Sequence, residues 1–139
     1  MPQQNLPAVC ERAAKGEGSH RVFLDAILST NGVILYVHGG NLSHVGGVAV
    51  GIPRPSTRNP AQLTANVSVI SILGHKDDEL ARPLADKVAR RLNQIAVVIV
   101  GIHVDGATSQ DLEVVTCNAH AVVDEWLERI DEKEDVYNV

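Results

Sequence analysis

The segment that most constrains the fold is IAVVIVGI, residues 95–102, in which every residue except Gly101 is apolar. A strand that is apolar on both faces is typical of a central strand covered on two sides. The chain leaves this segment through His103 and Asp105, in GIHVDGAT (101–108). A second apolar segment runs in the same way into SILGHKDDE (71–79). Two strands that each end in a histidine and acidic residues suggest one shared site.

The length of 139 residues predicts a single domain, and the composition excludes several classes of protein. The net charge of -5 and the aromatic content of 3% argue against nucleic acid binding. No apolar run approaches the roughly 20 residues of a membrane span, and the N-terminus lacks the pattern of a signal peptide. Cys10 and Cys117 do not form a metal-type pair, so we expect both to be reduced in a cytoplasmic protein.

The apolar patterns predict five strands, over 21–28, 32–40, 48–52, 65–73 and 95–102, and two helices, over about 77–92 and 109–131. Asn31-Gly32 predicts a type I′ hairpin turn, and Thr108 with Asp111 predicts a capping box. We expect a flexible arm over 1–18, a single domain over 19–131 and a frayed acidic tail over 132–139. The predicted fold is α+β (mixed α/β), a single mixed sheet of about five strands with two helices packed on it, in the order β-β-β-β-α-β-α.

The predicted topology brings the histidines to one edge of the sheet. If the first four strands form an antiparallel meander and the 77–92 helix is a crossover, the strands over 32–40, 65–73 and 95–102 run in the same direction. Their carboxyl ends, where ligands of mixed α/β sheets tend to bind, then share an edge with the start of the 48–52 strand. This edge would hold His38, His44, His75, His103, Asp77, Asp78 and Asp105. Glycines at 39, 40, 46, 47, 74 and 106 would permit close backbone approach, and the helix amino ends could hold an anion.

Each histidine has a simpler interpretation when it is taken alone. A histidine after an apolar strand is usually hydrogen-bonded at the rim of a core, and HKDDE can be a polar helix start. The repetition of the pattern on two strands, with a third histidine from the Gly-rich loop, favours a metal or phosphate site. We expect a divalent metal to use His44, His75 and His103, and we assign no role to His20 or His120.

The residues predict a binding protein more readily than an enzyme. Neither a nucleophile elbow, nor a P-loop, nor a dinucleotide fingerprint is present. Asp77 and Asp78 are adjacent, so they cannot both face a substrate as an acid/base pair would. The IPRPS segment (52–56) is expected at the edge opposite the histidines. Arg54 and Ser56 could therefore reach the site only from a neighbouring subunit, or if a crossover joined the strands on either side of them.

Over about residues 20–115, the chain resembles the prenylated flavin chaperone family, the LpdD-like proteins. The resemblance rests on three segments: HVGGVAVGIPRPS, SVISILGHKDDELARPLADKVA and VVIVGIHVDGAT. The resemblance implies a non-catalytic holdase for reduced prenylated FMN, or FMN, that serves gallate-decarboxylase-type systems. It would take the cofactor from a flavin prenyltransferase and deliver it to a UbiD-type decarboxylase. The chain departs from the family at Ser43, where proline is frequent, and at Gly106, where asparagine is frequent.

The resemblance carries over His44, Arg54, Ser56, His75, Asp77, Asp78, His103 and Asp105 as site positions. Together with the neighbouring positions, the expected cofactor-binding set is Gly39, Gly40, His44, Gly46, Arg54, Ser56, Gly74, His75, Lys76, Asp77, Asp78, His103 and Asp105. A site shared between subunits predicts a homo-oligomer. We also expect the protein to bind neither nucleic acid nor membranes. Two alternatives stay open: a small metal-dependent enzyme acting on a phosphorylated substrate, and a structural accessory subunit of a decarboxylase.

Overall fold

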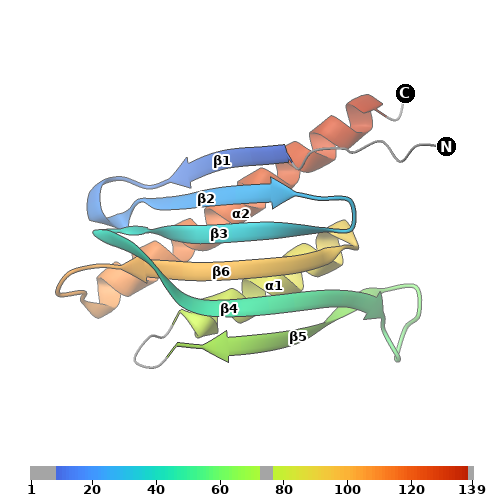
Figure 1. The fold of residues 1–139 in the computed structure, drawn as a ribbon, viewed down its shortest axis with the longest axis horizontal. Coiled ribbons are helices and arrows are strands. Elements are labelled where there is room, and N and C mark those ends of the chain that lie inside the picture. Colours follow the sequence, from blue (N-terminus) through green and yellow to red (C-terminus); the bar gives the residue numbers. More distant parts are fainter. Residues whose placement is uncertain (1–8, 73–76, 138–139) are drawn as a thin grey trace.

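The protein folds as a six-stranded mixed sheet with both helices on one face (Figure 1). This computed structural model describes residues 9–72 and 77–137. The elements are β1 (Val9–Lys15), the 3-10 turn η1 (Gly18–His20), β2 (Val22–Leu28), β3 (Gly32–Gly40), β4 (Leu42–Pro55), β5 (Leu63–Ser71), α1 (Asp78–Leu92), β6 (Ile95–His103) and α2 (Ser109–Tyr137). The predicted fold class is confirmed, with one strand more than expected.

The additional strand is β1, which pairs antiparallel with β2 and forms one edge of the sheet. The flexible arm that we predicted over 1–18 is therefore wrong for residues 9–15, which form a strand. The segment VCERAAK has little strand character of its own, and distant partners hold it in place. Arg12 pairs with Asp25 at 2.6 Å, and Trp126 Nε1 donates to Glu11 Oε2 at 2.9 Å. At the other end of the chain, α2 continues to Tyr137, beyond the predicted end at residue 131.

The strand order, β1-β2-β3-β6-β4-β5, differs from the predicted meander because β6 lies between β3 and β4. β6 pairs parallel with β3 and antiparallel with β4, so the most apolar strand takes a central position. The strand directions are nevertheless as predicted, since β3, β5 and β6 run the same way and β4 runs opposite to them. Their carboxyl ends therefore share one edge with the start of β4.

The β2–β3 hairpin is also confirmed, but its turn is not of type I′. The Ser29 amide donates to the Gly32 carbonyl at 3.0 Å, and neither Asn31 nor Gly32 has a positive φ.

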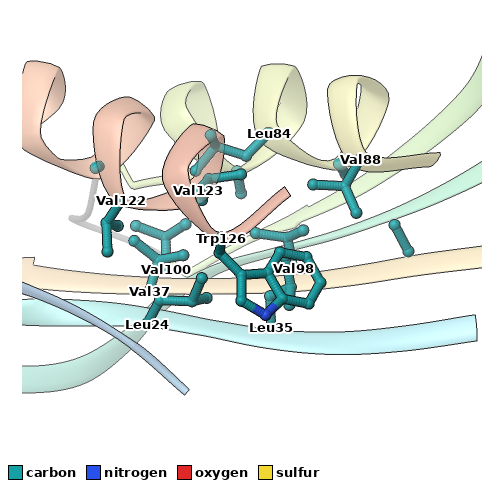
Figure 2. Packing of buried hydrophobic residues seen from close by; sticks show 14 of the residues in the cluster. Leu24, Leu35, Val37, Leu84, Val88, Val98, Val100, Val122, Val123 and Trp126 are labelled. Atoms are coloured by element: carbon teal, nitrogen blue, oxygen red, sulfur yellow. The ribbon is translucent and has the colours of Figure 1, made fainter. Parts of the chain in front are cut away.

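The core lies between the sheet and the two helices, with Trp126 at its centre (Figure 2). The fully buried side chains with the largest volumes are Trp126, Leu24, Leu35, Leu84, Leu127, Val22, Val37, Val88, Val98, Val100, Val122 and Val123. Each aliphatic side chain of this kind stabilises the fold by about 1.5–3 kcal/mol. Helix α1 packs tightly on β4, because a Cβ at Gly51 would lie 2.6 Å from the carbonyl oxygen of Ala85. This packing fixes the amino end of α1 beside the start of β4.

Candidate functional site

The site is built around residues 41–46, where Asn41 and the first residues of β4 carry the chain from the end of β3 across the end of β6. The Asn41 amide donates to the His103 carbonyl at 2.7 Å, and the Asp105 amide donates to Asn41 Oδ1 at 2.9 Å. The pairing of β4 with β6 is interrupted between Ser43 and Gly47. The His44 carbonyl oxygen there lies 1.4 Å from the position of a Cβ at Gly101. Only glycine at the end of this apolar strand lets the crossing segment pass.

The His44 side chain contacts the amino end of α1. Its Nε2 lies 3.0 Å from Asp77 Oδ2, and the two side chains are only 18% and 14% exposed. Asp77 Oδ1 also accepts the Ile102 amide at 3.5 Å, which links α1 to the end of β6. Gly46 makes this arrangement possible, since a Cβ there would lie 1.9 Å from Asp77 Oδ2.

His103 forms a second histidine–carboxylate pair beside the first. Its Nε2 lies 3.0 Å from Asp105 Oδ1, and its ring centroid lies 6.3 Å from that of His44 at an interplanar angle of 80°. The structure thus brings together four of the side chains that the sequence placed at this edge. In each pair the carboxylate lies against Nε2 of the ring. Metal-ligating histidines commonly have a carboxylate in this position.

His38 supports the crossing segment from the other face of the sheet. Its Nδ1 lies 2.7 Å from Ser43 Oγ, and its Nε2 lies 2.7 Å from Asp25 Oδ2. Its ring stacks on Tyr36 at 4.2 Å, and the Tyr36 hydroxyl donates to the His44 carbonyl at 2.9 Å. The Arg12 guanidinium, which donates to Asp25, lowers the pKa of that carboxyl. His38 therefore has a positioning role in which both ring nitrogens are engaged.

Other predicted site residues lie elsewhere or serve the fold. Gly74, His75 and Lys76 fall outside the described residues. Asp78 accepts a hydrogen bond from Ser71 Oγ at 2.7 Å, which ties β5 to α1. Arg54 and Ser56 lie at the opposite end of β4, as predicted, and Arg54 Nε donates to Asn66 Oδ1 at 2.7 Å.

The glycines at the end of β3 serve close packing within the chain. A Cβ at Gly39 would lie 2.2 Å from the Arg21 carbonyl oxygen, and one at Gly40 would lie 2.1 Å from the His103 carbonyl oxygen. At Gly39 and Gly40, the close approach that we expected for a ligand is therefore made by the chain's own backbone.

The two histidine–carboxylate pairs lie beside a cavity of about 430 Å³ between α1, α2 and the end of β6. This volume is within the range of about 300–1,000 Å³ that is typical of small-molecule sites. The polar lining on one side comes from His44, Asp77 and His103. The apolar lining residues are Leu80, Pro83, Ile102, Val104, Leu112 and Val115.

His120 also lines this cavity, although the sequence analysis gave it no role. Lys87 Nζ donates to His120 Nδ1 at 3.0 Å and to Asp124 Oδ1 at 2.9 Å. Burial lowers the pKa of His120, and the Lys87 charge lowers it further. The ring is therefore neutral at pH 7, and its remaining proton is on Nε2. The spacing of Leu112, Thr116 and His120, each four residues apart on α2, could have indicated this shared face.

The amino end of α2 has the predicted capping box. The Asp111 amide donates to Thr108 Oγ1 at 3.1 Å, and the Thr108 amide donates to Asp111 Oδ2 at 2.8 Å. His20, which lies 2.8 Å from Asp111 Oδ1, adds to this cap. These contacts, led by the Thr108 amide, lower the pKa of Asp111 to about 2. His20 thus belongs to a histidine–carboxylate pair that does not line the cavity.

The described residues bear on two predictions from the sequence, a metal site and the absence of a membrane span. Within 9–72 and 77–137, no group of three or more His, Cys, Asp or Glu side chains is arranged to hold a metal ion. His75, one of the three predicted metal ligands with His44 and His103, lies outside these ranges. Among the helices of the same ranges, none is sufficiently long and apolar to span a membrane.

Comparisons with known proteins bear on both the fold and the family. No curated protein matches the sequence. The crystal structure of a chaperone complex for yeast 20S proteasome assembly is similar in fold, with a TM-score of 0.58 and 18% sequence identity. The similarity covers 91% of this chain and 98% of the yeast chain. Residues 16–131 match the profile of the prenylated flavin chaperone LpdD-like domain, which is most of the chain. The protein is thus a member of the prenylated flavin chaperone LpdD-like family.

Proposed function

We propose that this protein is a non-catalytic holdase that binds reduced prenylated FMN in the cavity between α1, α2 and β6. The observation that carries the proposal is the cavity itself, which joins two histidine–carboxylate pairs to a neutral histidine across an apolar lining. The family supplies the chaperone role and the class of ligand. We further propose that the protein receives the cofactor from a flavin prenyltransferase and delivers it to a UbiD-type decarboxylase.

The charges around the cavity favour a divalent metal at the phosphate end. Asp77 and Glu79 line the cavity, and Asp105 lies beside His103. No lysine or arginine is among the described lining residues, so this part of the lining offers a phosphate group no side chain with a permanent positive charge. A divalent cation would supply the positive charge that attracts the phosphate. His44 and His103 would hold this cation, together with His75 as the third imidazole.

The other end of the cavity fits a flavin ring system. Six of the twelve lining residues are aliphatic, in agreement with the aromatic content of 3%. His120 offers an Nε2–H donor in a fixed tautomer, because Lys87 occupies its Nδ1. A ring carbonyl or ring nitrogen of the flavin is the natural acceptor. Unmodified FMN, which shares these acceptors and the phosphate, is a second ligand of the same site.

Arg54 and Ser56 enter this proposal only through a second copy of the chain. They lie at the opposite end of β4 from His44, and they cannot reach the cavity within one chain. A homo-oligomer in which the end of β4 of one copy lies beside the cavity of another would bring Arg54 and Ser56 to the ligand.

The proposal is tested by anaerobic titration of the protein with reduced prenylated FMN, with and without Mn²⁺. The affinity of wild type should increase with the metal, and His44→Ala or His103→Ala should weaken binding about tenfold or more. His20→Ala is the matched control, because it also removes a histidine paired with an aspartate. Equal affinities for wild type, H44A and H103A would overturn the proposal.

A second assay separates the holdase from its alternatives. Apo decarboxylase should gain activity when it is mixed with the flavin-loaded protein, and the flavin should be recovered chemically unchanged. Conversion of the bound compound by this protein alone would instead indicate an enzyme. Full activation of the decarboxylase by H44A and H103A would instead indicate a structural accessory subunit.

A further inference from the structure

We propose that the free edge of β5 is a docking site for an extended segment of a partner protein, with aliphatic side chains at alternate positions and a carboxylate. β5 is the last strand in the order of the sheet, and its inner side pairs with β4. Figure 1 shows β5 at the lower edge, and none of the elements within 9–72 and 77–137 lies beyond it. A free edge of this kind is a template for a strand from another chain.

The backbone hydrogen bonds at the two ends of β5 determine which of its groups face outward. The Ile72 amide donates to the Gly46 carbonyl at 3.2 Å, and the Ser56 amide donates to the Gln62 carbonyl at 2.8 Å. Both bonds fit the register of β4 with β5, so the even-numbered residues of β5 point their amide and carbonyl groups at β4. The residues that point these groups at the free edge are therefore the odd-numbered ones, Leu63, Ala65, Val67, Val69 and Ser71.

The free edge of β5 lacks the features that normally protect such an edge. Charged side chains, prolines and bulges are the usual protection. The sequence of β5, LTANVSVIS, contains no charged residue and no proline, and its pairing with β4 continues without a shift in register. The opposite edge of the sheet is different, because β1 carries Glu11, Arg12 and Lys15. Of the two edges, β5 is thus the one that is suited to receive another strand.

A groove of about 380 Å³ lies beside this edge, between β5 and α1. Its lining residues are Ala65 and Val67 from β5 and Arg82, Pro83 and Asp86 from α1. The side chains of an added strand alternate between the two faces of the sheet, so every second one would point to the helix side and enter this groove. The lining that β5 contributes is apolar, which favours aliphatic side chains at these positions.

The groove also has a positive charge that the described residues do not balance. Asp86 is held by Arg90 at 2.8 Å, whereas Arg82 is exposed and makes no hydrogen bond or ion pair with the described residues. A carboxylate on the docked segment would supply the missing partner of Arg82. A second copy of β5 would not, because β5 has no acidic residue. The charges therefore favour a different protein over a second copy of this chain.

The groove adjoins the cavity between α1, α2 and β6, because Pro83 lines both of them. A partner docked on β5 would therefore lie beside the proposed flavin site. This position suits a protein that exchanges the ligand with this one, and only that consequence rests on the proposed function. The docking site itself does not depend on flavin binding.

The test begins with random nine-residue peptides, displayed on phage and selected against the full chain without any flavin. The enriched peptides should alternate aliphatic with polar residues and contain Asp or Glu. One of them, made synthetically, should slow the hydrogen exchange of the Ala65, Val67 and Val69 amides, which face outward. The Ser68 and Ile70 amides should not change, because they already donate to β4.

Calorimetry with the same peptide compares wild type with three variants. Val67→Pro removes one outward amide and no bond to β4, and it should weaken binding at least tenfold. Arg82→Gln should weaken binding about three- to fivefold, as expected for an exposed ion pair. Arg129→Gln, which changes an exposed arginine on α2, is the matched control and should bind like wild type. Circular dichroism establishes that each variant is folded, and if Val67→Pro is not, the exchange of the wild-type amides decides.

Three results would count against the proposal. The first is a selection that enriches no peptide, or a peptide that leaves the exchange of the outward amides unchanged. The second is equal peptide affinity for wild type and folded V67P, or for wild type and R82Q, which would remove the edge or the carboxylate from the proposal. The third is a lower molar mass of V67P in light scattering, because the edge would then join two copies of this chain.

Discussion

The replacement Gly101→Ala should displace His44 from the site without any change to a side chain in the cavity. A Cβ at this position would lie 1.4 Å from the His44 carbonyl oxygen, whereas ordinary contacts begin at 3.4 Å. The crossing segment must therefore shift by about 2 Å, the difference between these two distances. Such a shift breaks the 2.9 Å hydrogen bond from Tyr36 and separates His44 from Asp77.

The expected cost follows from the two contacts that are lost. The Tyr36 hydrogen bond contributes about 1 kcal/mol, and the histidine–carboxylate contact contributes about 1–3 kcal/mol. At about 2.1 cal/mol/K per residue, 139 residues give an unfolding entropy of about 290 cal/mol/K. A loss of about 2–4 kcal/mol then lowers Tm by about 7–14 °C.

Thermal unfolding and NMR spectra of the His44 ring provide the measurements. Gly18→Ala is the control, because Gly18 also resists a side chain, with φ of 57°, but a Cβ there meets nothing within 4 Å. Its conformational strain should cost about 1–2 kcal/mol and leave the His44 signals unchanged. An unshifted His44 spectrum in Gly101→Ala, with a Tm no lower than that of Gly18→Ala, would refute the reasoning.

Three further predictions follow from the helices around the cavity. Thr108→Ala removes the cap of α2 and should lower stability by about 1 kcal/mol, whereas Thr116→Ala within the same helix should not; chemical denaturation measures both. The pKa of Asp111 is about 2, whereas the ordinary value is 3.8. The ionised carboxylate therefore stabilises the folded state above about pH 4, and this stabilisation is lost as the pH falls from 3.8 to 2. Asp111→Asn should therefore lose less stability than wild type over that window in acid denaturation, and equal losses would contradict the assignment. Lys87→Met should raise the pKa of His120 toward 6.5 and free its Nδ1, and an NMR titration that shows no change would contradict the proposed tautomer.

The sequence predicted the helices, the strand directions and the edge that holds the site, because these depend on local patterns and on the crossover rule. The apolar runs of β6 and the four-residue spacing along α1 are signals within one segment. Together with the hairpin they determine which strand ends meet. His44 and His103 follow directly from that arrangement.

The features that the sequence did not predict depend on contacts between distant segments. β6 lies between β3 and β4, and Gly101 leaves room for the chain that crosses its end, but a single glycine does not reveal this order in a sequence. β1 depends on Trp126, which lies 115 residues along the chain from its partner Glu11. His120 acquires its fixed tautomer from Lys87 on the other helix, 33 residues away.

The central place of β6 also has a consequence for how the protein is made. β1–β3 and β4–β5 are synthesised first, as two small sheets whose inner edges, β3 and β4, have no partner until residues 95–103 leave the ribosome. Unpaired strand edges readily join other chains, and pairing between distant segments is slow. The last strand therefore closes two aggregation-prone edges in one step, so a nascent chain that stalls before residue 95 exposes both.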